Sequence, residues 1–290
     1  MKSTIFSKVL LLCLLLALPA LGEGALEDLP LDFTPGHVAD PALFTEDSYS
    51  DESLTVRVWR ETIDGCTFNV ADITVLSPSQ LRTAVTDRGR TNKISTLARQ
   101  NHAVVAIGGD YFRNEEGGYV VRMQEVFRKK PRKSHDMLVI DGNGDFHILV
   151  KSNAAELEKL VKGDVPLINV FNFGPALVVD SVLQDMPETY TYNIRRPEPR
   201  CAIGQLGPLH YLFCVADGRG ASGSEGCTVE TLARFMADQG CLQAYNLDGG
   251  NSALMVFNGE NYSSKSFKAE RSVSDIIYVA TLVDSGLDGD

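Results

Sequence analysis

Three consecutive local signals in the second half of the chain constrain its fold most. Tyr211–Ala216 is a continuous apolar run, which is typical of a strand buried on both faces. A glycine-rich loop, 217–226, follows this run. The next segment is bounded by Thr228 as the expected N-cap and Gly240 as the left-handed stop, and its apolar face consists of Val229, Leu232, Ala233 and Met236. The sequence therefore predicts a strand, an open loop and a short helix in this order.

The other strong signals are mostly strands. Apolar residues alternate or run continuously in Leu54–Trp59, Phe68–Leu76, Ala103–Ile107, Met137–Ile140, Phe146–Val150, Leu242–Leu247, Ala253–Phe257 and Ile276–Leu282. Ile94–Ala98 predicts one or two helical turns. The segment 141–145 lacks the glycine and glutamate positions of a calcium loop, so it is predicted to be a hairpin turn. Because strands outnumber helices, we expect an α+β fold with a single domain on a mixed β-sheet with short helices.

The N-terminus predicts export. Lys2 and Lys8 precede the apolar run Val9–Leu18, and the small residues Ala20 and Gly22 follow it. This order is typical of a secretory signal peptide, here 1–22, with an uncleaved anchor as the alternative. We therefore expect a secreted or periplasmic protein.

Composition changes after the signal peptide. Residues 23–50 are rich in Pro, Asp, Glu and Ser without periodicity, so we expect a mobile leader there. The domain is predicted to occupy 51–283, with its core starting near Leu54, and 284–290 to form a C-terminal tail. No later stretch reaches the roughly 20 apolar residues of a membrane helix, so no stable membrane span is expected.

Charge excludes one class of partner. The chain has 27 Lys and Arg against 38 Asp and Glu among its 290 residues, a formal net charge of −11. No basic run outweighs this background, so nucleic acid is not an expected partner.

Five cysteines remain after the signal peptide: Cys66, Cys201, Cys214, Cys227 and Cys241. None of them shows C-x-x-C spacing, and the histidines have no metal-ligand spacing, so no metal site is predicted. The best candidates for a disulfide are Cys201 and Cys214, which lie on consecutive predicted strands, although two buried thiols are an equal alternative.

The loop Gly218-Arg-Gly-Ala-Ser-Gly223 matches the G-x-G-x-x-G pattern of dinucleotide-binding proteins. Four residues separate Gly223 from the helix cap, whereas a Rossmann turn opens its helix within the motif. The loop is better interpreted as an anion pocket formed by backbone N–H groups and the N-terminus of the following helix, with Arg219 adding positive charge. No cofactor is expected.

Five motifs occur in an order that resembles the phosphodiester glycosidase family: Gly109-Asp-Tyr-Phe112, Phe173-Gly-Pro-Ala-Leu177, Arg200-Cys-Ala-Ile-Gly204, Asp217-Gly-Arg219 with Ser222, and Asn246-Leu-Asp-Gly-Gly250 with Ser252. The resemblance spans roughly 51–283, so this segment would be the catalytic domain. Asn251 departs from the pattern, since the family usually has a third glycine there.

The resemblance implies a hydrolase that removes a sugar, such as N-acetylglucosamine, from a sugar-1-phosphodiester on an envelope or extracellular glycan. Phosphate is a good leaving group, so the enzyme must mainly bind the anion and stabilise an oxocarbenium-like transition state. Arg200 and Arg219 are the predicted phosphate ligands, each through a two-bond fork.

Carboxylates would supply the chemistry. Asp248 is assigned as nucleophile or general base, Asp110 as its acid or base partner, and Asp217 as a third carboxylate of the same pocket. Each of these follows a predicted strand beside glycines, where an aspartate is often only a turn residue or cap. The other predicted substrate-binding residues are Ser222, Asn246, Gly249, Gly250, Ser252, Tyr111 and Arg271. Asn246 and Ser252 would contact sugar hydroxyls or orient Asp248, Tyr111 would stack on the sugar, and Arg271 matches a family arginine.

Two other classes of function stay open. In the first, the three aspartates hold a divalent cation and the protein is a metal-dependent phosphodiesterase that breaks a P–O bond. In the second, the pocket binds an envelope glycan without turnover. Transfer of solvent oxygen to the sugar or to the phosphate would separate hydrolysis at carbon from hydrolysis at phosphorus.

Overall fold

The computed structural model describes residues 31, 34–86, 92–266 and 268–287. Regular structure is dominated by strands, with three α-helices in the described part: α1 (Ile94–Gln100), α2 (Ala154–Val161) and α3 (Val229–Asp238). Short 3-10 turns are η1 (Pro41–Leu43), η2 (Pro78–Gln80), η3 (Phe112–Asn114), η4 (Val150–Ser152) and η5 (Gly250–Ser252). The predicted signal peptide lies outside the described residues. No described helix is long and apolar enough to span a membrane.

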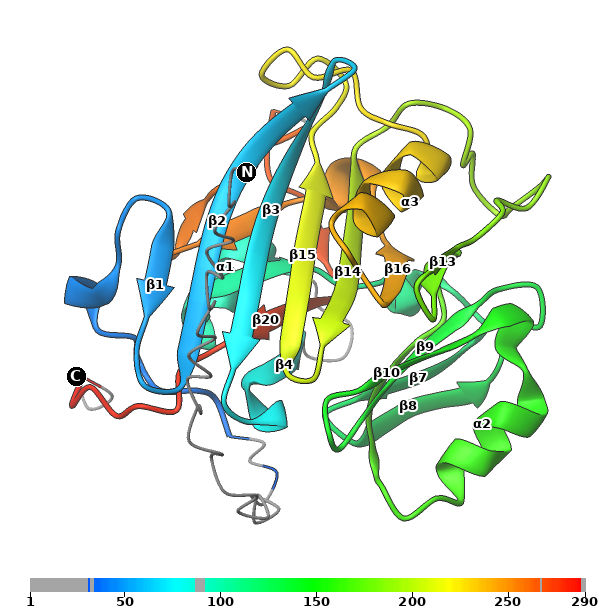
Figure 1. The fold of residues 1–290 in the computed structure, drawn as a ribbon, viewed down its shortest axis with the longest axis horizontal. Helices are drawn as coiled ribbons and strands as arrows, with labels where there is room; N and C mark the ends of the chain where they lie inside the picture. Colours follow the sequence, from blue (N-terminus) through cyan, green and yellow to red (C-terminus); the bar gives the residue numbers. More distant parts are fainter. Residues whose placement is uncertain (1–30, 32–33, 87–91, 267, 288–290) are drawn as a thin grey trace, which may run out of the picture. The chain divides into compact units, whose positions relative to one another are not determined.

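An eight-stranded sheet carries most of the motifs (Figure 1). Its spatial order is β1-β2-β3-β15-β14-β16-β12-β13. The strands are β1 (Ser48–Ser50), β2 (Leu54–Ile63), β3 (Cys66–Val75), β12 (Ala176–Val179), β13 (Val182–Leu183), β14 (Arg200–Gly207), β15 (His210–Ala216) and β16 (Gln243–Leu247). The β2–β3 turn is Asp64-Gly65, whose φ values of 49° and 75° are those that a two-residue hairpin turn requires.

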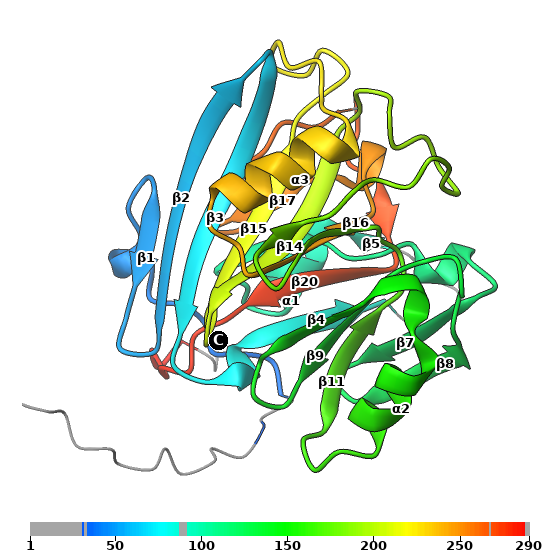
Figure 2. The ribbon, with the colours of Figure 1, turned by 45° about the vertical axis from the view of Figure 1, so that its right-hand side comes forward.

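The remaining strands form three smaller sheets (Figure 2). One has the order β10-β9-β11-β7-β8, another β18-β17-β6-β20-β4, and β19 pairs with β5. The bounds are β4 (Leu81–Val85), β5 (Asn92–Lys93), β6 (Val105–Gly108), β7 (Gly118–Arg122), β8 (Glu125–Lys130), β9 (Met137–Asp141), β10 (Phe146–Leu149), β11 (Leu167–Phe171), β17 (Met255–Phe257), β18 (Glu260–Asn261), β19 (Ser272–Val273) and β20 (Asp275–Val279).

The expectation of one mixed sheet is wrong. Every strand pair between described strands is antiparallel, and the strands are divided among several sheets. Parallel pairs need long crossover connections, usually helices, and the described part has few helices to supply them. The fold is therefore sheet-dominated.

The strongest local predictions are confirmed. Helix α3 begins after Thr228, whose side chain accepts from the Thr231 N–H, and Gly240 follows with φ 84°. Phe235 stacks on Phe68 of β3 with centroids 4.0 Å apart, so α3 packs on one face of the large sheet. The predicted hairpin is β9–β10, with Asp141 accepting from backbone N–H groups of its turn.

The end of the predicted leader differs from expectation. Strand β1 pairs with β2 and Tyr49 is buried, although both lie before residue 51. The Tyr49 hydroxyl donates to Asp51 at 2.7 Å. Contacts further back, such as His102 Nδ1 with the Gly36 carbonyl at 2.7 Å, also attach this segment, although its composition indicates a leader.

The cysteines of the described part are buried free thiols. Cys201 lies opposite Val215, so its side chain faces away from that of Cys214, which lies opposite Ala202. Accordingly, the two belong to hydrophobic clusters on opposite faces of the sheet. This register does not allow the disulfide that their spacing suggested.

Candidate active site

A cavity of about 440 Å³ opens where several chain segments leave their strands. Its wall contains Tyr111, Glu115, Phe173, Thr191, Tyr192, Asn193, Glu198, Arg200, Arg219, Leu247, Asp248, Gly249, Gly250 and Arg271. These residues come from the segments that follow β6 and β11, the segment before β14 and its first residue, the glycine-rich loop, the end of β16 with the turn after it, and the segment before β19. Most predicted substrate-binding residues therefore meet in one place.

Glycines after β16 shape this wall. A Cβ on Gly249 would lie 2.7 Å from the Pro199 carbonyl oxygen, and Gly250 has φ 58°. The Gly250 N–H donates to that same carbonyl at 2.8 Å. The two glycines thus let the backbone turn tightly after Asp248, which leaves the Asp248 side chain on the cavity wall.

Asp248 is a carboxyl group with strongly altered acidity. Part of its surface remains open to the cavity, but protein atoms surround most of it. Burial raises the pKa of Asp248 to about 6; the Ser252 hydrogen bond and the charge of Arg271 oppose this shift, and Asp110 adds to it. A carboxyl group with such a pKa changes protonation state near neutral pH and can act as a base.

Arg271 and Tyr111 form a second part of the wall. Arg271 Nη2 donates to the Tyr111 hydroxyl at 2.9 Å, and its guanidinium lies 4.9 Å from the tyrosine ring centroid. These contacts fix the cation close enough to Asp248 to favour the ionised carboxylate.

Arg200 is a buried cation with few free donors. Its Nε donates to the Cys227 carbonyl at 3.1 Å, and Nη2 donates to the carbonyls of Asn193 and Arg196 at 3.0 and 2.7 Å. Burial lowers the pKa of Arg200, and no carboxylate of the described chain lies within ion-pair distance of it. Two of the three guanidinium nitrogens of Arg200 therefore donate to backbone carbonyls and do not form the predicted two-bond fork to phosphate. The third nitrogen, Nη1, could donate to an anion.

Arg219 is held by two side chains at the cavity rim. Its Nε lies 2.6 Å from Glu198 Oε2, and its Nη1 donates to Asn251 Oδ1 at 2.5 Å. Asn251 is the residue that departs from the motif of the resembled family. Its side chain orients Arg219, which the motifs predict to be a phosphate ligand.

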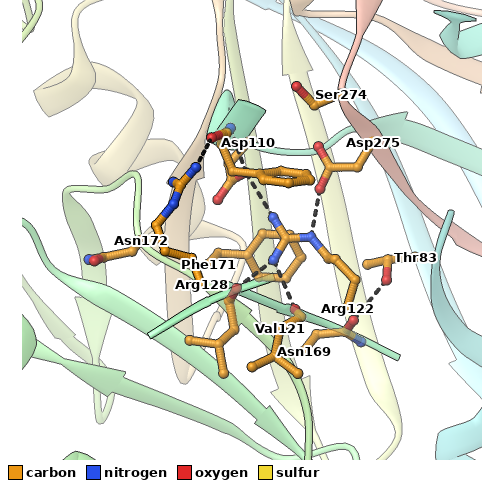
Figure 3. Close-up of polar contacts among 12 residues, drawn as sticks. Thr83, Asp110, Val121, Arg122, Arg128, Asn169, Phe171, Asn172, Ser274 and Asp275 are labelled. Atoms are coloured by element: carbon orange, nitrogen blue, oxygen red, sulfur yellow. Dashed lines mark hydrogen bonds and ion pairs between the residues drawn. The ribbon is translucent and has the colours of Figure 1, made fainter. Parts of the chain in front are cut away.

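Asp110 lies in a buried ion-pair network behind the wall (Figure 3). Arg122 Nη2 lies 2.7 Å from Asp110 Oδ1, and Arg122 Nε donates to Asp275 Oδ2 at 2.6 Å. The guanidinium also lies 3.9 Å from the Phe171 ring centroid. Burial raises the pKa of Asp275 to about 7, although Arg122 opposes the shift. Asp110 does not line the main cavity, so the structure gives this carboxylate an ion-pair partner rather than direct access to a substrate.

Asp217 and Ser222 also lie away from the cavity wall. Asp217 accepts from Asn69 Nδ2 at 2.9 Å and from the Ser264 N–H at 3.0 Å, and Ser222 Oγ lies 2.6 Å from Ser264 Oγ. Both residues connect the glycine-rich loop to the segment after β18. The metal-dependent alternative requires Asp110, Asp217 and Asp248 to share one site, and in the structure they do not.

Asn246 and Ser252 support the wall from behind. Asn246 Nδ2 donates to the Gly174 carbonyl at 2.9 Å and to the Tyr192 hydroxyl at 2.7 Å, whereas Ser252 bonds to Asp248. Both are buried, so they orient Tyr192 and Asp248 rather than face the cavity. Within the described ranges, no group of three or more His, Cys, Asp and Glu residues could hold a metal ion.

Sequence reasoning missed several wall residues, namely Glu115, Thr191, Tyr192, Asn193 and Glu198. All lie in segments without hydrophobic periodicity. The arginine-rich stretch before β14 is the one signal that could have indicated an anion-binding segment there.

Substitution of Asp217 by asparagine tests its placement. We expect turnover within about twofold of the parent protein, because the amide oxygen can still accept from Ser264 and the side chain does not reach the cavity. The measurement is kcat/KM on a sugar phosphodiester, with folding checked by circular dichroism. A hundredfold loss in a folded variant would place Asp217 in the reaction.

Comparison with known proteins defines the class. The model of the phosphodiester glycosidase family matches residues 101–280, more than half of the chain. The chain therefore belongs to the phosphodiester glycosidase family, a family of glycosidase-type hydrolases, and the resemblance of its five motifs is confirmed.

Individual proteins also resemble this chain in sequence or in fold. The uncharacterized SPbeta prophage-derived protein YomE of Bacillus subtilis (strain 168) is 31% identical over 112 residues, which cover 39% of this chain and only 17% of that relative. Among solved structures, the zebrafish N-acetylglucosamine-1-phosphodiester alpha-N-acetylglucosaminidase catalytic domain, auto-inhibited by its pro-peptide, has a TM-score of 0.62 at 17% identity over 82% of this chain and 87% of that one. A hypothetical protein from Synechocystis has a TM-score of 0.56 at 15% identity, covering 81% and 64% of the two chains. At these identities the structural likeness concerns the fold.

Proposed function

We propose that this protein hydrolyses the bond between the anomeric carbon of a sugar, of the N-acetylglucosamine type, and a phosphodiester on an envelope or extracellular glycan. One observation carries the proposal: the carboxyl group of Asp248, with its pKa near 6, lies on the same cavity wall as the guanidinium groups of Arg200, Arg219 and Arg271. A phosphodiester anion and an electron-poor anomeric carbon need these two kinds of group side by side.

The arginines bind the phosphate. Arg200 contributes a buried positive charge that lacks a carboxylate partner, so an anion in the cavity would compensate it. Arg219 is fixed by Glu198 and Asn251, so little side-chain freedom is lost when it contacts a ligand. Local cations are needed because the whole chain carries a net charge of −11.

Asp248 acts at the anomeric carbon, as nucleophile or as the base that activates water. Both roles need the ionised carboxylate. The phosphate leaving group is already stable as an anion, so a strong general acid is not needed. The absence of a strong general acid agrees with the position of Asp110, which pairs with Arg122 and does not line the main cavity.

The pKa of Asp248 predicts the pH dependence. Below about pH 6 the carboxyl group is protonated and inactive, so kcat/KM should fall about tenfold per pH unit on the acid side and level off above pH 6. A pH–rate profile with a substrate that has no ionisation between pH 4 and 8 measures this limb. A rate that is constant, or that rises as the pH falls, would remove Asp248 from the base or nucleophile role.

Turnover itself is tested with N-acetylglucosamine 1-(methyl phosphate). The proposal predicts free N-acetylglucosamine and methyl phosphate as products. Binding of this compound without release of sugar, across the pH range above, would favour the glycan-binding alternative instead.

The proposed location outside the cytoplasm depends on residues 1–22. N-terminal sequencing of the protein recovered from the medium or the periplasm tests it. A mature N-terminus near residue 23 is expected, and an intact Met1 on a cytoplasmic protein would contradict it.

A further inference from the structure

A second cavity lies next to the candidate active site. It measures about 380 Å³ and is lined by 188–195. Thr191, Tyr192 and Asn193 line both cavities, so the two share a wall. The proposed hydrolysis does not use the second cavity.

The aromatic rings of this wall are fixed from the inside. The Tyr190 hydroxyl donates to the Phe173 carbonyl at 2.5 Å, and the Tyr192 hydroxyl donates to the Gly174 carbonyl at 2.6 Å. The two rings lie edge to face with centroids 5.2 Å apart, and both remain partly exposed. With their hydroxyls engaged, the tyrosines offer rigid ring surfaces of the kind that pack against sugars.

Arginine side chains lie near this wall. Arg195 lines the second cavity, is exposed, and has no carboxylate within ion-pair distance in the described chain; Glu188 is the acidic residue of that cavity. On the other side, Arg132 pairs with Glu115 of the main cavity at 3.0 Å, and His135 Nε2 lies 3.0 Å from the hydroxyl of Thr191.

Lys133 lies between these two anchors. Arg132 and His135 each contact a residue that lines the main cavity, and Lys133 directly follows Arg132 in this segment of the chain. Its side chain is exposed, and none of the ion pairs between described residues includes it. Arg195 on the second cavity and Lys133 in the segment that contacts the main cavity are thus two exposed cations, and neither has a carboxylate partner among the described residues of this acidic protein.

We propose that the second cavity binds the neighbouring sugar-phosphate unit of an oligomeric substrate, with the unit's sugar against Tyr190 and Tyr192 and its phosphodiester attracted by Arg195 and Lys133. The substrate class is then a chain of repeated sugar-phosphate units rather than a glycan with a single phosphodiester. This inference rests on the proposed function and extends it to the substrate beyond the reacting bond.

The test compares two substrates. One is N-acetylglucosamine 1-(methyl phosphate), and the other is a synthetic trimer of phosphodiester-linked N-acetylglucosamine units. The unmodified protein is expected to have a kcat/KM at least about tenfold higher for the trimer, and added salt should lower this preference because it screens exposed charges.

Charge reversal identifies the residues. Lys133→Glu combined with Arg195→Glu should lower kcat/KM for the trimer about tenfold and change the monomer value far less. Lys159→Glu combined with Arg57→Glu is the matched control, because both residues are exposed, neither lines either cavity, and the net charge changes by the same amount. Thermal unfolding of each variant checks that the fold is kept.

The outcomes distinguish the proposed second sugar-phosphate site from the proposed hydrolysis. Equal values for monomer and trimer, or a trimer preference that the double charge reversal leaves intact, would overturn the second site while the proposed activity stands. Absence of turnover with both substrates would contradict the proposed function itself.

Discussion

Replacement of Asp248 by asparagine should lower kcat/KM for a sugar phosphodiester at least about a hundredfold, since an amide can act neither as base nor as nucleophile. The fold should be retained, because the amide has the size of the carboxyl group and can still bond to Ser252. Burial penalises the ionised carboxylate, so the variant should be no less stable than the parent protein at pH 7. Steady-state kinetics and thermal unfolding measure the two effects.

The control for this experiment is Asp72→Asn. Asp72 is a partly exposed carboxylate of β3 that lies 2.7 Å from His210, far in sequence from the motifs. We expect its loss to leave kcat/KM unchanged. Unaltered kinetics in a folded Asp248→Asn variant would show that this carboxyl group takes no part in the reaction.

The largest effect on stability is expected for Arg122→Met. The guanidinium lies between two buried carboxylates, Asp110 and Asp275, and its removal leaves both without a counter-charge. Breaking a buried ion pair in this way costs about 3–5 kcal/mol. Denaturant unfolding at pH 7 measures the loss. Arg57→Met, at an exposed position of β2, is the matched control and should change stability by about 0.5 kcal/mol or less.

The pH dependence of the Arg122→Met defect has a definite sign. Without Arg122, burial raises the pKa of the Asp275 carboxyl group further, so this group is neutral in acid and becomes charged beside Asp110 as the pH rises. The defect should therefore be small in acid and grow as the pH rises. Adding Asp110→Asn and Asp275→Asn should recover part of the lost stability. A defect below about 1 kcal/mol at pH 7 would mean that the network is not a major stabilising element.

Local signals predicted the elements but not their arrangement. The strand Tyr211–Ala216 and helix α3 could be predicted because apolar spacing and caps are encoded within a few residues. The sheet order depends on long-range pairing, such as β15 with β3 and β12 with β16, for which the sequence carries no local mark. The assumption of a mixed sheet failed for that reason.

The site was predicted best where the motif residues directly follow the end of a strand. Asp248, Gly249 and Gly250 directly follow β16, so their position on the wall depends on one strand end. In the glycine-rich loop, Arg219 and Gly220 have φ values of 57° and 79°. The chain turns there, so Arg219 reaches the wall whereas Ser222 contacts Ser264 instead.

Arg122 and Asp275 could not have been identified from the sequence. An arginine at the end of a strand usually indicates a solvent-exposed position, because a lone buried cation is costly. Its burial makes sense only with two carboxylates, one of which is 153 residues away in the chain. Such a network becomes visible only after the sheets have been assembled.

Hydrolysis in water enriched in oxygen-18 tests the central claim most directly. The substrate is N-acetylglucosamine 1-(methyl phosphate), and mass spectrometry of the methyl phosphate product is the decisive readout, because the anomeric oxygen of a free sugar can exchange with water. Methyl phosphate incubated with the protein in the same water controls for exchange after the reaction. Cleavage of the glycosidic C–O bond predicts methyl phosphate without label, whereas label in the methyl phosphate would show attack at phosphorus and contradict the glycosidase account.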